Sequence, residues 1–341
     1  MNKIKLISLA AAALLTVSSC GDDDLSQQSI FGNEETSQSA FDKWIKANYT
    51  DPYNIRFVYR YTDYETDNSY NVIPASEKKS EALAILIKYV WVDAYDEVMG
   101  NTFLKQYAPR IFQLIGSNEY NSQGSVVMGT AEGGVKITLF DVNSIDPSKI
   151  LIDQDSPLPN YSSNPVDLNY RYFHTIHHEF CHILTQKKNY STDFRTVSAG
   201  NYHTSDWINV KDEDAPSMGF VTNYASSEYN EDFAEIYATY VTHSDKGWKA
   251  LLDEAVIAKT DENGDTVWMK DNNGNFVYTK DENGKEVRVP SYDYSGYNAI
   301  MQKLDLVKDY FKSQWGFDID KMREVVLRRS REAADLKLTI E

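Results

Sequence analysis

The chain has 341 residues, 42% of them hydrophobic, and its 51 acidic side chains outnumber the 34 basic ones, for a formal net charge of −17. This length allows one large domain or two ordinary ones, with enough apolar residues for a substantial core. The negative charge argues against a nucleic-acid ligand, because the phosphates would be repelled.

Residues 1–19 predict a signal peptide. Two lysines precede the apolar run LISLAAAALL, and small residues lead up to Cys20. The run is too short to span a bilayer as a mature helix. The residues directly before Cys20 resemble a bacterial lipobox, in which the cysteine is lipidated and becomes the first residue of the mature chain. The plainer alternative is a secreted protein in which Cys20 has no such role.

The segment 20–36 is acidic and polar, which is typical of an unstructured tether. Its start, GDDDLSQQS after Cys20, resembles the export signal of lipoproteins that reach the outer surface of Gram-negative bacteria. These features predict an outer-membrane lipoprotein that is exposed at the cell surface and anchored through Cys20. The other cysteine, Cys181, then has no disulfide partner within the chain, and we expect it to be a small buried residue.

The remainder, residues 37–341, is predicted to form one α+β domain. The spacing of apolar residues predicts a short helix over 36–49, a strand over 54–64, a long helix over 76–100 that ends at Gly100, and sheet segments within 103–117 and 134–143. We expect the last of these strands to offer an edge on which an extended peptide can pair.

The second half of the chain contains further helices and one repeat. Helices are predicted over 172–186, 230–243, 297–316 and 318–336. Three ten-residue copies, DENGDTVWMK, DNNGNFVYTK and DENGKEVRVP, each carry an Asn-Gly pair of the kind found in tight hairpin turns. They predict a small β-meander inserted at 260–290. A calcium loop is less favoured, because the glycine is fourth in each copy and not sixth as in an EF-hand.

The stretch YFHTIHHEFCHILTQ, at 172–186, holds four of the chain's six histidines. His178, Glu179 and His182 form the motif H-E-x-x-H. Residues four apart share one face of a helix, so both imidazoles can bind one ion, and neutral imidazole is a usual zinc ligand. Glu179 lies one residue further round, where its carboxylate can act as the general base in hydrolysis. The alternative is a histidine-rich helix packed in a core.

A third metal ligand is expected in the helix NEDFAEIYATYVTH, at 230–243. Asn230 is a natural helix cap, which puts Glu231 in the first turn, where the helix dipole favours a carboxylate. Glu235, one turn later, can contact the free nitrogen of a ligand histidine. The alternative makes Glu235 the ligand and Glu231 a helix-end charge. Asp232 is expected to be exposed.

The segments HHEFCHILTQ and NYASSEYNEDFAEIYATY together resemble the gluzincin metallopeptidases, including the catalytic domain of anthrax lethal factor. The resemblance implies a zincin-like domain in which His178, His182 and Glu231 bind one zinc ion. It also implies that Glu179 is the base and that Tyr224, seven residues before Glu231, donates a hydrogen bond to the developing oxyanion.

With the lipobox, the chain resembles more narrowly the substrate import-associated zinc metallohydrolase lipoproteins, which are found beside outer-membrane nutrient-uptake systems. This resemblance implies a zinc hydrolase, chiefly a peptidase, that cleaves peptides or glycopeptides at the cell surface with an uptake complex as partner. The alternative function is a catalytically weak zinc-containing lipoprotein that binds substrates for such a system. The intact Glu179 favours the enzyme, because a binding protein needs no base there.

Three further histidines are given no metal role. His174 is expected beside the site, His177 in a structural position and His203 in a solvated loop.

Overall fold

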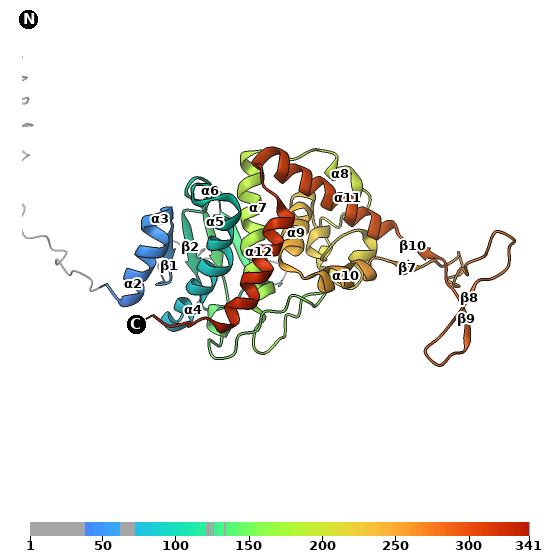
Figure 1. Cartoon of the computed structure of the whole chain (residues 1–341), viewed down its shortest axis with the longest axis horizontal. Coiled ribbons are helices and arrows are strands. Elements are labelled where there is room, and N and C mark those ends of the chain that lie inside the picture. Colours follow the sequence, from blue (N-terminus) through green and yellow to red (C-terminus); the bar gives the residue numbers. More distant parts are fainter. Residues whose placement is uncertain (1–37, 62–71, 121–123, 125, 133, 341) are drawn as a thin grey trace, which may run out of the picture. The chain divides into compact units, whose positions relative to one another are not determined.

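The computed structural model describes residues 38–61, 72–120, 124, 126–132 and 134–340 (Figure 1). The predicted signal peptide, Cys20 and nearly all of the segment before Ala40 lie outside these residues, as does the end of the strand predicted over 54–64. The residues from Ala40 onward form one compact unit. None of the described helices is both long enough and apolar enough to cross a membrane.

Helices make up about half of the described chain. The α-helices are α2 (Ala40–Ile45), α3 (Asp51–Tyr53), α4 (Glu77–Ile87), α5 (Asp93–Met99), α6 (Asn101–Tyr107), α7 (Thr175–Lys187), α8 (Phe194–Val197), α9 (Tyr229–Thr242), α10 (Asp245–Glu254), α11 (Ser295–Tyr310) and α12 (Ile319–Glu332). π-helical turns extend several of them, among which η3 (Lys88–Val92) joins α4 to α5 and η5 (Asn169–His174) leads into α7. The long helix predicted over 76–100 is therefore confirmed as α4, η3 and α5 in succession, and it ends at Gly100 with a φ of 76°.

A four-stranded sheet supports these helices. Its order is β1 (Arg56–Val58), β2 (Ile111–Leu114), β6 (Lys136–Leu139) and β5 (Gly129–Glu132). β1, β2 and β6 are parallel, whereas β5 is antiparallel to β6. Helices packed on a small mixed sheet confirm the predicted α+β class.

Two details of the predicted sheet are wrong. The first part of the segment 103–117 lies in helix α6, so that only β2 joins the sheet. β6 is not an edge, because β2 and β5 occupy its two sides. The edge strands of this sheet, as far as the structure describes it, are β1 and β5.

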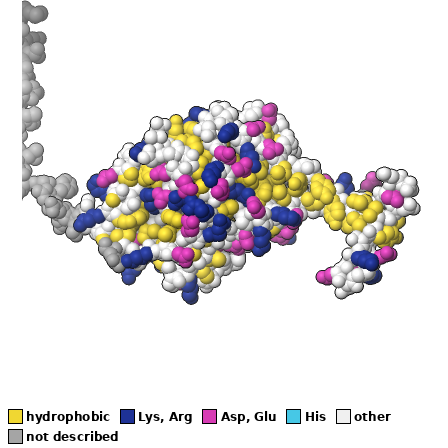
Figure 2. Space-filling view, viewed as in Figure 1, with side chains coloured by type: hydrophobic (Ala, Val, Ile, Leu, Met, Phe, Trp, Pro, Cys, Tyr) yellow, Lys and Arg dark blue, Asp and Glu magenta, His cyan; other side chains and the backbone are white. Residues whose placement is uncertain are grey.

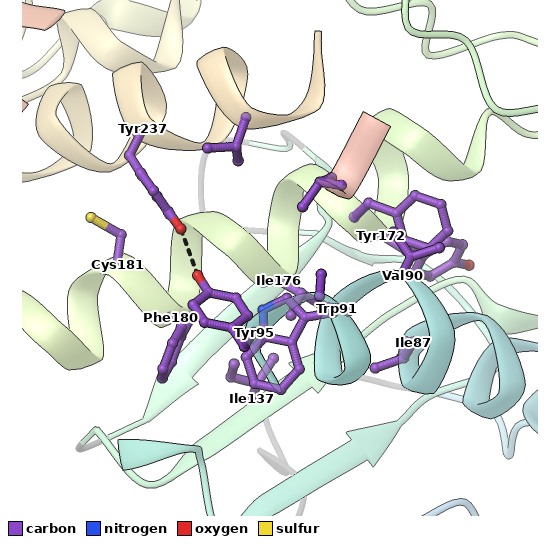
Figure 3. Packing of buried hydrophobic residues seen from close by; sticks show 14 of the residues in the cluster. Ile87, Val90, Trp91, Tyr95, Ile137, Tyr172, Ile176, Phe180, Cys181 and Tyr237 are labelled. Atoms are coloured by element: carbon purple, nitrogen blue, oxygen red, sulfur yellow. Dashed lines mark hydrogen bonds between the residues drawn. The ribbon is translucent and has the colours of Figure 1, made fainter. Parts of the chain in front are cut away.

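The core lies between the sheet and the helices α4, α5 and α7. Phe57, Phe112 and Ile137 are side by side in register across β1, β2 and β6. Trp91 of η3 packs edge-on against Phe112, with ring centroids 5.7 Å apart. It also packs edge-on against Phe180 of α7, at 5.2 Å (Figure 3). These aromatic contacts hold one face of α7 against the sheet.

Helix α9 packs along α7 and is itself held from two sides. The hydroxyls of Tyr237 on α9 and Tyr95 on α5 form a hydrogen bond (Figure 3). At the other end of α9, Asp232 forms a fully buried ion pair with Lys303 of α11, whose ammonium also donates to the carbonyl oxygen of Gly219. Asp232 is therefore not exposed as expected. It faces α11, and the lysine compensates for its buried charge.

The three repeats form the consecutive hairpins of the predicted β-meander, and the bases of these hairpins also pair with one another. The backbone N–H groups of Lys259, Ser291 and Val267 donate to one another's carbonyls in a closed triangle. Met269, Val289 and Val277 form a second triangle in the same way. Each hairpin base thus pairs with two neighbours, which joins the hairpins in a three-cornered arrangement. The turns need the positive φ of 84°, 85° and 78° at Gly264, Gly274 and Gly284.

This hairpin segment contributes nothing to the core, since no residue of 256–295 is buried. It also carries half of the exposed large hydrophobic side chains of the described chain. These are Ile257, Val267, Met269, Phe276, Tyr278, Tyr292 and Tyr294. Figure 2 shows hydrophobic side chains over this segment, between the ends of α10 and α11.

The edge strand packs tightly on α7. A Cβ atom at Gly129 would lie 2.4 Å from the Thr175 methyl and 3.1 Å from the Thr138 carbonyl oxygen. We therefore expect Gly129→Ala to push β5 away from α7 and to lower the free energy of unfolding by about 1–3 kcal/mol in urea titrations. Adding Thr175→Ser, which removes the methyl, should restore part of the loss.

Gly200→Ala is the matched control, because nothing lies within 4 Å of its added Cβ. Its effect should stay within about 0.5 kcal/mol. Equal effects of the two glycine substitutions would contradict tight packing of β5 on α7.

Candidate metal centre

Helices α7 and α9 bring three of the predicted ligands together. His178 and His182 lie one turn apart on α7, and their Nε2 atoms are 3.0 Å apart. Glu231 reaches them from the first turn of α9, with its Oε2 3.0 Å from His178 Nε2 and 3.1 Å from His182 Nε2. Within the described residues, this is the group of three or more His, Cys, Asp or Glu side chains with the geometry to hold a metal ion.

The donor set fits zinc. Four ligands placed tetrahedrally at 2.0–2.1 Å are about 3.4 Å apart, close to the three distances found here. The two imidazole nitrogens and the carboxylate oxygen also direct lone pairs at one another. A cation bound between the three atoms would offset the repulsion between these lone pairs. Two nitrogens and one oxygen leave the fourth position open, as in catalytic zinc sites.

Glu231 reaches the site by a different local structure from the predicted one. Asn230 is not the cap of α9, because Glu228 has the extended backbone of the N-cap and the helix begins at Tyr229. The Asn230 amide instead donates to Glu228, and its oxygen accepts from the Tyr190 hydroxyl. Glu231 remains in the first turn. Burial alone would raise its pKa, but His178 and His182 outweigh this and hold the pKa well below its usual range.

Glu235 lies behind the first histidine. Its Oε1 is 2.7 Å from His178 Nδ1, the ring nitrogen directed away from Glu231, and its Oε2 accepts from the Thr222 hydroxyl at 2.6 Å. Burial alone would raise the pKa of Glu235, yet His174 and His178 lower it to about 2. A carboxylate in this position fixes the ring orientation and the tautomer of a metal-ligating histidine.

Glu179 is adjacent to the ligand set but not part of it. Its side chain lines the hollows on both sides of the three ligands, and burial raises the pKa of its carboxyl above the usual value. A raised pKa makes a carboxylate a stronger base at neutral pH.

Tyr224 is brought next to the ligands by the short turn η8 (Tyr224–Ser226). Its ring centroid is 5.9 Å from that of His178 and 5.1 Å from that of Trp207, and its side chain is 37% exposed. A phenol is protonated at neutral pH, so Tyr224 presents a hydrogen-bond donor at the cleft.

The other histidines and Cys181 are outside the ligand set. His174 is buried, with its Nε2 3.5 Å from Glu235 Oε1. His177 is fully buried beside Tyr95, and His203 is a partly exposed loop residue 3.2 Å from Asp206. Cys181 is buried, as predicted.

Two hollows flank the ligands, one on each side. We call the first the aromatic hollow; its volume is about 480 Å³, and its walls include Val127, Met128, Tyr161, Tyr170, Trp207 and Ile208. We call the second the polar hollow; its volume is about 490 Å³, and its walls include Thr130, Thr185, Gln186, Asn189, Arg195 and Asn230. Gly129 of β5, Glu179 and Tyr224 line both hollows. The two together form a cleft of ligand-binding size along β5.

Comparisons with known proteins agree with this geometry. Residues 34–320 match the family model described as "Putative zinc-binding metallo-peptidase". The chain belongs to this family. A crystal structure of a protein from Bacteroides caccae, described in the same words, is 34% identical and superimposes with a TM-score of 0.63 over 92% of this chain and 100% of that chain. No curated protein matches the chain significantly.

Membership of a family of zinc-binding metallopeptidases assigns the protein, in general class, to the zinc-dependent peptidases. It also makes zinc the metal expected at the site formed by His178, His182 and Glu231.

Several residues that shape the site were not predicted from the sequence. Thr222, Tyr161 and Trp207 come from irregular segments with no helical or alternating pattern to place them. Lys303 left a detectable signal, since it is a lysine on the apolar side of a predicted helix. Its partner, Asp232, could not be inferred, because the contact joins helices 71 positions apart in the chain.

Removal of single ligands tests this centre. We expect purified wild-type protein to hold one zinc ion, and Glu231→Ala to weaken zinc binding more than Glu235→Ala, whose loss should be about 10- to 100-fold. His203→Ala, a histidine outside the donor set, should bind zinc like the wild type. Metal content by mass spectrometry and competition with a chelator measure these affinities. A larger loss in Glu235→Ala than in Glu231→Ala would move the third ligand by one turn.

Proposed function

We propose that this metallopeptidase is of the gluzincin type and hydrolyses peptides or glycopeptides in the cleft along β5. The observation that carries the proposal is the convergence of His178, His182 and Glu231 from two helices, with Glu179 beside them, in the middle of that cleft.

Each nearby side chain has a chemical role in this proposal. A zinc ion held by His178, His182 and Glu231 would supply Lewis acidity toward a water and the scissile carbonyl. Glu179 accepts a proton from the attacking water and passes it to the leaving amine. Tyr224 donates a hydrogen bond to the negative charge that develops on the carbonyl oxygen.

The substrate backbone is proposed to pair with the free side of β5. β5 is an edge strand of the sheet and lies against α7, with Gly129 lining both hollows. Main-chain hydrogen bonds from an edge strand hold a peptide extended without reading its side chains. Side-chain preference then falls to the two hollows.

Replacement of the proposed base tests the mechanism. Glu179→Gln keeps the size of the side chain but removes its basicity, so hydrolysis should fall by at least about 10²-fold while zinc content is unchanged. The measurement is turnover of a peptide library, followed by mass spectrometry of the products, which also identifies the bond that is cut. Hydrolysis at the wild-type rate in Glu179→Gln would overturn the role of Glu179. A wild type that binds zinc and library peptides but cleaves none would favour the substrate-binding alternative.

The location is also a proposal, resting on the lipobox-like residues before Cys20 and on the acidic segment after it. We place the enzyme on the cell surface, anchored in the outer membrane through Cys20, with an uptake complex as partner. Cys20→Ser should shift the protein from the membrane fraction to the soluble fraction and abolish labelling with a clickable fatty acid. Unchanged membrane association and labelling of Cys20→Ser would refute the anchor.

A further inference from the structure

Arg171 differs from its neighbours in the aromatic hollow. Among the residues that line this hollow, it is the one Lys or Arg, and its side chain is 10% exposed. It lies on η5, the π-helical turn that leads into α7. It precedes His178 by seven residues, and both side chains line the aromatic hollow, about 10 Å apart along the helix axis.

Two neighbours hold the guanidinium of Arg171 in place, and it has more N–H donors than these two contacts use. Its Nη1 donates to Asn118 Oδ1 at 3.3 Å, and its Nη2 is 3.5 Å from Asp141 Oδ2. Both distances exceed the 2.7–2.9 Å of a strong charge-assisted hydrogen bond, and a guanidinium has five N–H donors. Asp141 also accepts from the Ser144 hydroxyl at 2.6 Å, so its charge is shared between two donors.

The surroundings favour an anion at this end of the hollow. Val127, Met128 and Ile208 provide apolar walls, which strengthen a charge interaction by excluding water. The carboxylates that line the hollow are Glu179 and Glu235, and both are at the metal end, where His174 and His178 face Glu235.

The direction of the substrate follows from β5. Residues 126–129 border the aromatic hollow, and residues 129–130 border the polar hollow. The chain at β5 therefore runs from the aromatic hollow to the polar hollow, and α7 runs in the same direction. A peptide that pairs antiparallel to β5, the more stable of the two arrangements, therefore has its carboxyl side in the aromatic hollow. The leaving fragment of the substrate then points toward Arg171.

We propose that Arg171 binds a carboxylate of the leaving fragment, one or two residues beyond the scissile bond. Two residues of an extended chain span at most about 7 Å, and a charge-assisted contact adds about 3 Å, which together are comparable with the roughly 10 Å of helix axis between His178 and Arg171; one residue suffices where the long arginine side chain reaches back toward the metal end. The carboxylate is either the C-terminus of a short leaving fragment or an acidic side chain. The inference rests on the proposed peptidase function, and makes the enzyme selective for acidic or C-terminal leaving groups.

Arg171 has a structural role as well, because it ties Asn118 and Asp141 to η5. A purely structural arginine would affect all substrates equally when it is replaced. A carboxylate-binding arginine would affect only those that carry the carboxylate, so the ratio between matched ligands separates the two roles.

The test measures binding to the zinc-loaded full chain carrying Glu179→Gln, which binds without turnover. The probes are hexapeptide pools made both as C-terminal acids and as C-terminal amides, and amidated pools with Glu or Gln at one fixed position. We expect the acid, or the Glu peptide, to bind at least about 10-fold more tightly than its neutral match, and Arg171→Met to reduce this ratio to about one. The pair that shows the preference identifies the source of the carboxylate.

Arg110→Met is the matched control, because Arg110 donates to the carbonyl oxygens of Tyr53, Lys105 and Gln106 and lines neither hollow. It should keep the 10-fold ratio even if stability falls. The carboxylate site is overturned if the ratio of acid to neutral binding is near one with Arg171 in place. It is also overturned if the 10-fold ratio survives Arg171→Met. A preference that depends on an acid on the amino side of the cleaved bond overturns the direction.

Wild-type turnover of the same pools separates this inference from the proposed function. Hydrolysis without any acid preference overturns the role of Arg171 and keeps the peptidase. Acid-selective binding without hydrolysis overturns the peptidase. No binding of any pool overturns both.

Discussion

The packing of α7 against two partners at once is the constraint on which the rest of the structure depends. One face of the helix is buried on the sheet through Phe180 and Trp91, and another face carries His178 and His182 toward α9. Because both faces are occupied, the helix cannot rotate without loss of either core packing or metal ligands. The four-residue spacing of the histidines becomes a metal site only because aromatic packing fixes this rotation.

The position of helix α9 is also fixed, in this case by buried charges that need partners. Asp232 is compensated by Lys303, and Glu235 by Thr222 and the histidines of α7. Burial of either carboxylate without a partner would lower the stability of the fold by several kcal/mol. These partners therefore limit the positions that the helix can take. Glu231, directly before Asp232 in sequence, points at the two imidazoles. The position of the third ligand is thus a consequence of how its neighbours are paired.

The cleft follows from the sheet in a similar way. β5 closes the sheet next to α7, and a glycine at their contact allows the strand to lie close to the helix. The metal ligands therefore lie beside β5, an edge strand of the described sheet, with the aromatic hollow on one side and the polar hollow on the other. An extended peptide laid on this edge would have its two halves in different chemical surroundings. That asymmetry, more than the zinc site itself, is where selectivity between substrates can arise.

The sequence by itself determined the features that depend on local spacing. The long helix to Gly100, the α+β class and the pairing of His178 with His182 on one helix follow from periods of 2 and 3.6 residues, which neighbouring residues alone create. Tertiary structure decided what depends on distant contacts: the approach of Glu231, the burial of Asp232 against Lys303, the choice of β5 over β6 as an edge strand, and the pairing among the bases of the three hairpins. Each of these is set by hydrogen bonds, charges or packing between segments far apart in the chain, and a local pattern contains no information about which distant partner a residue will meet.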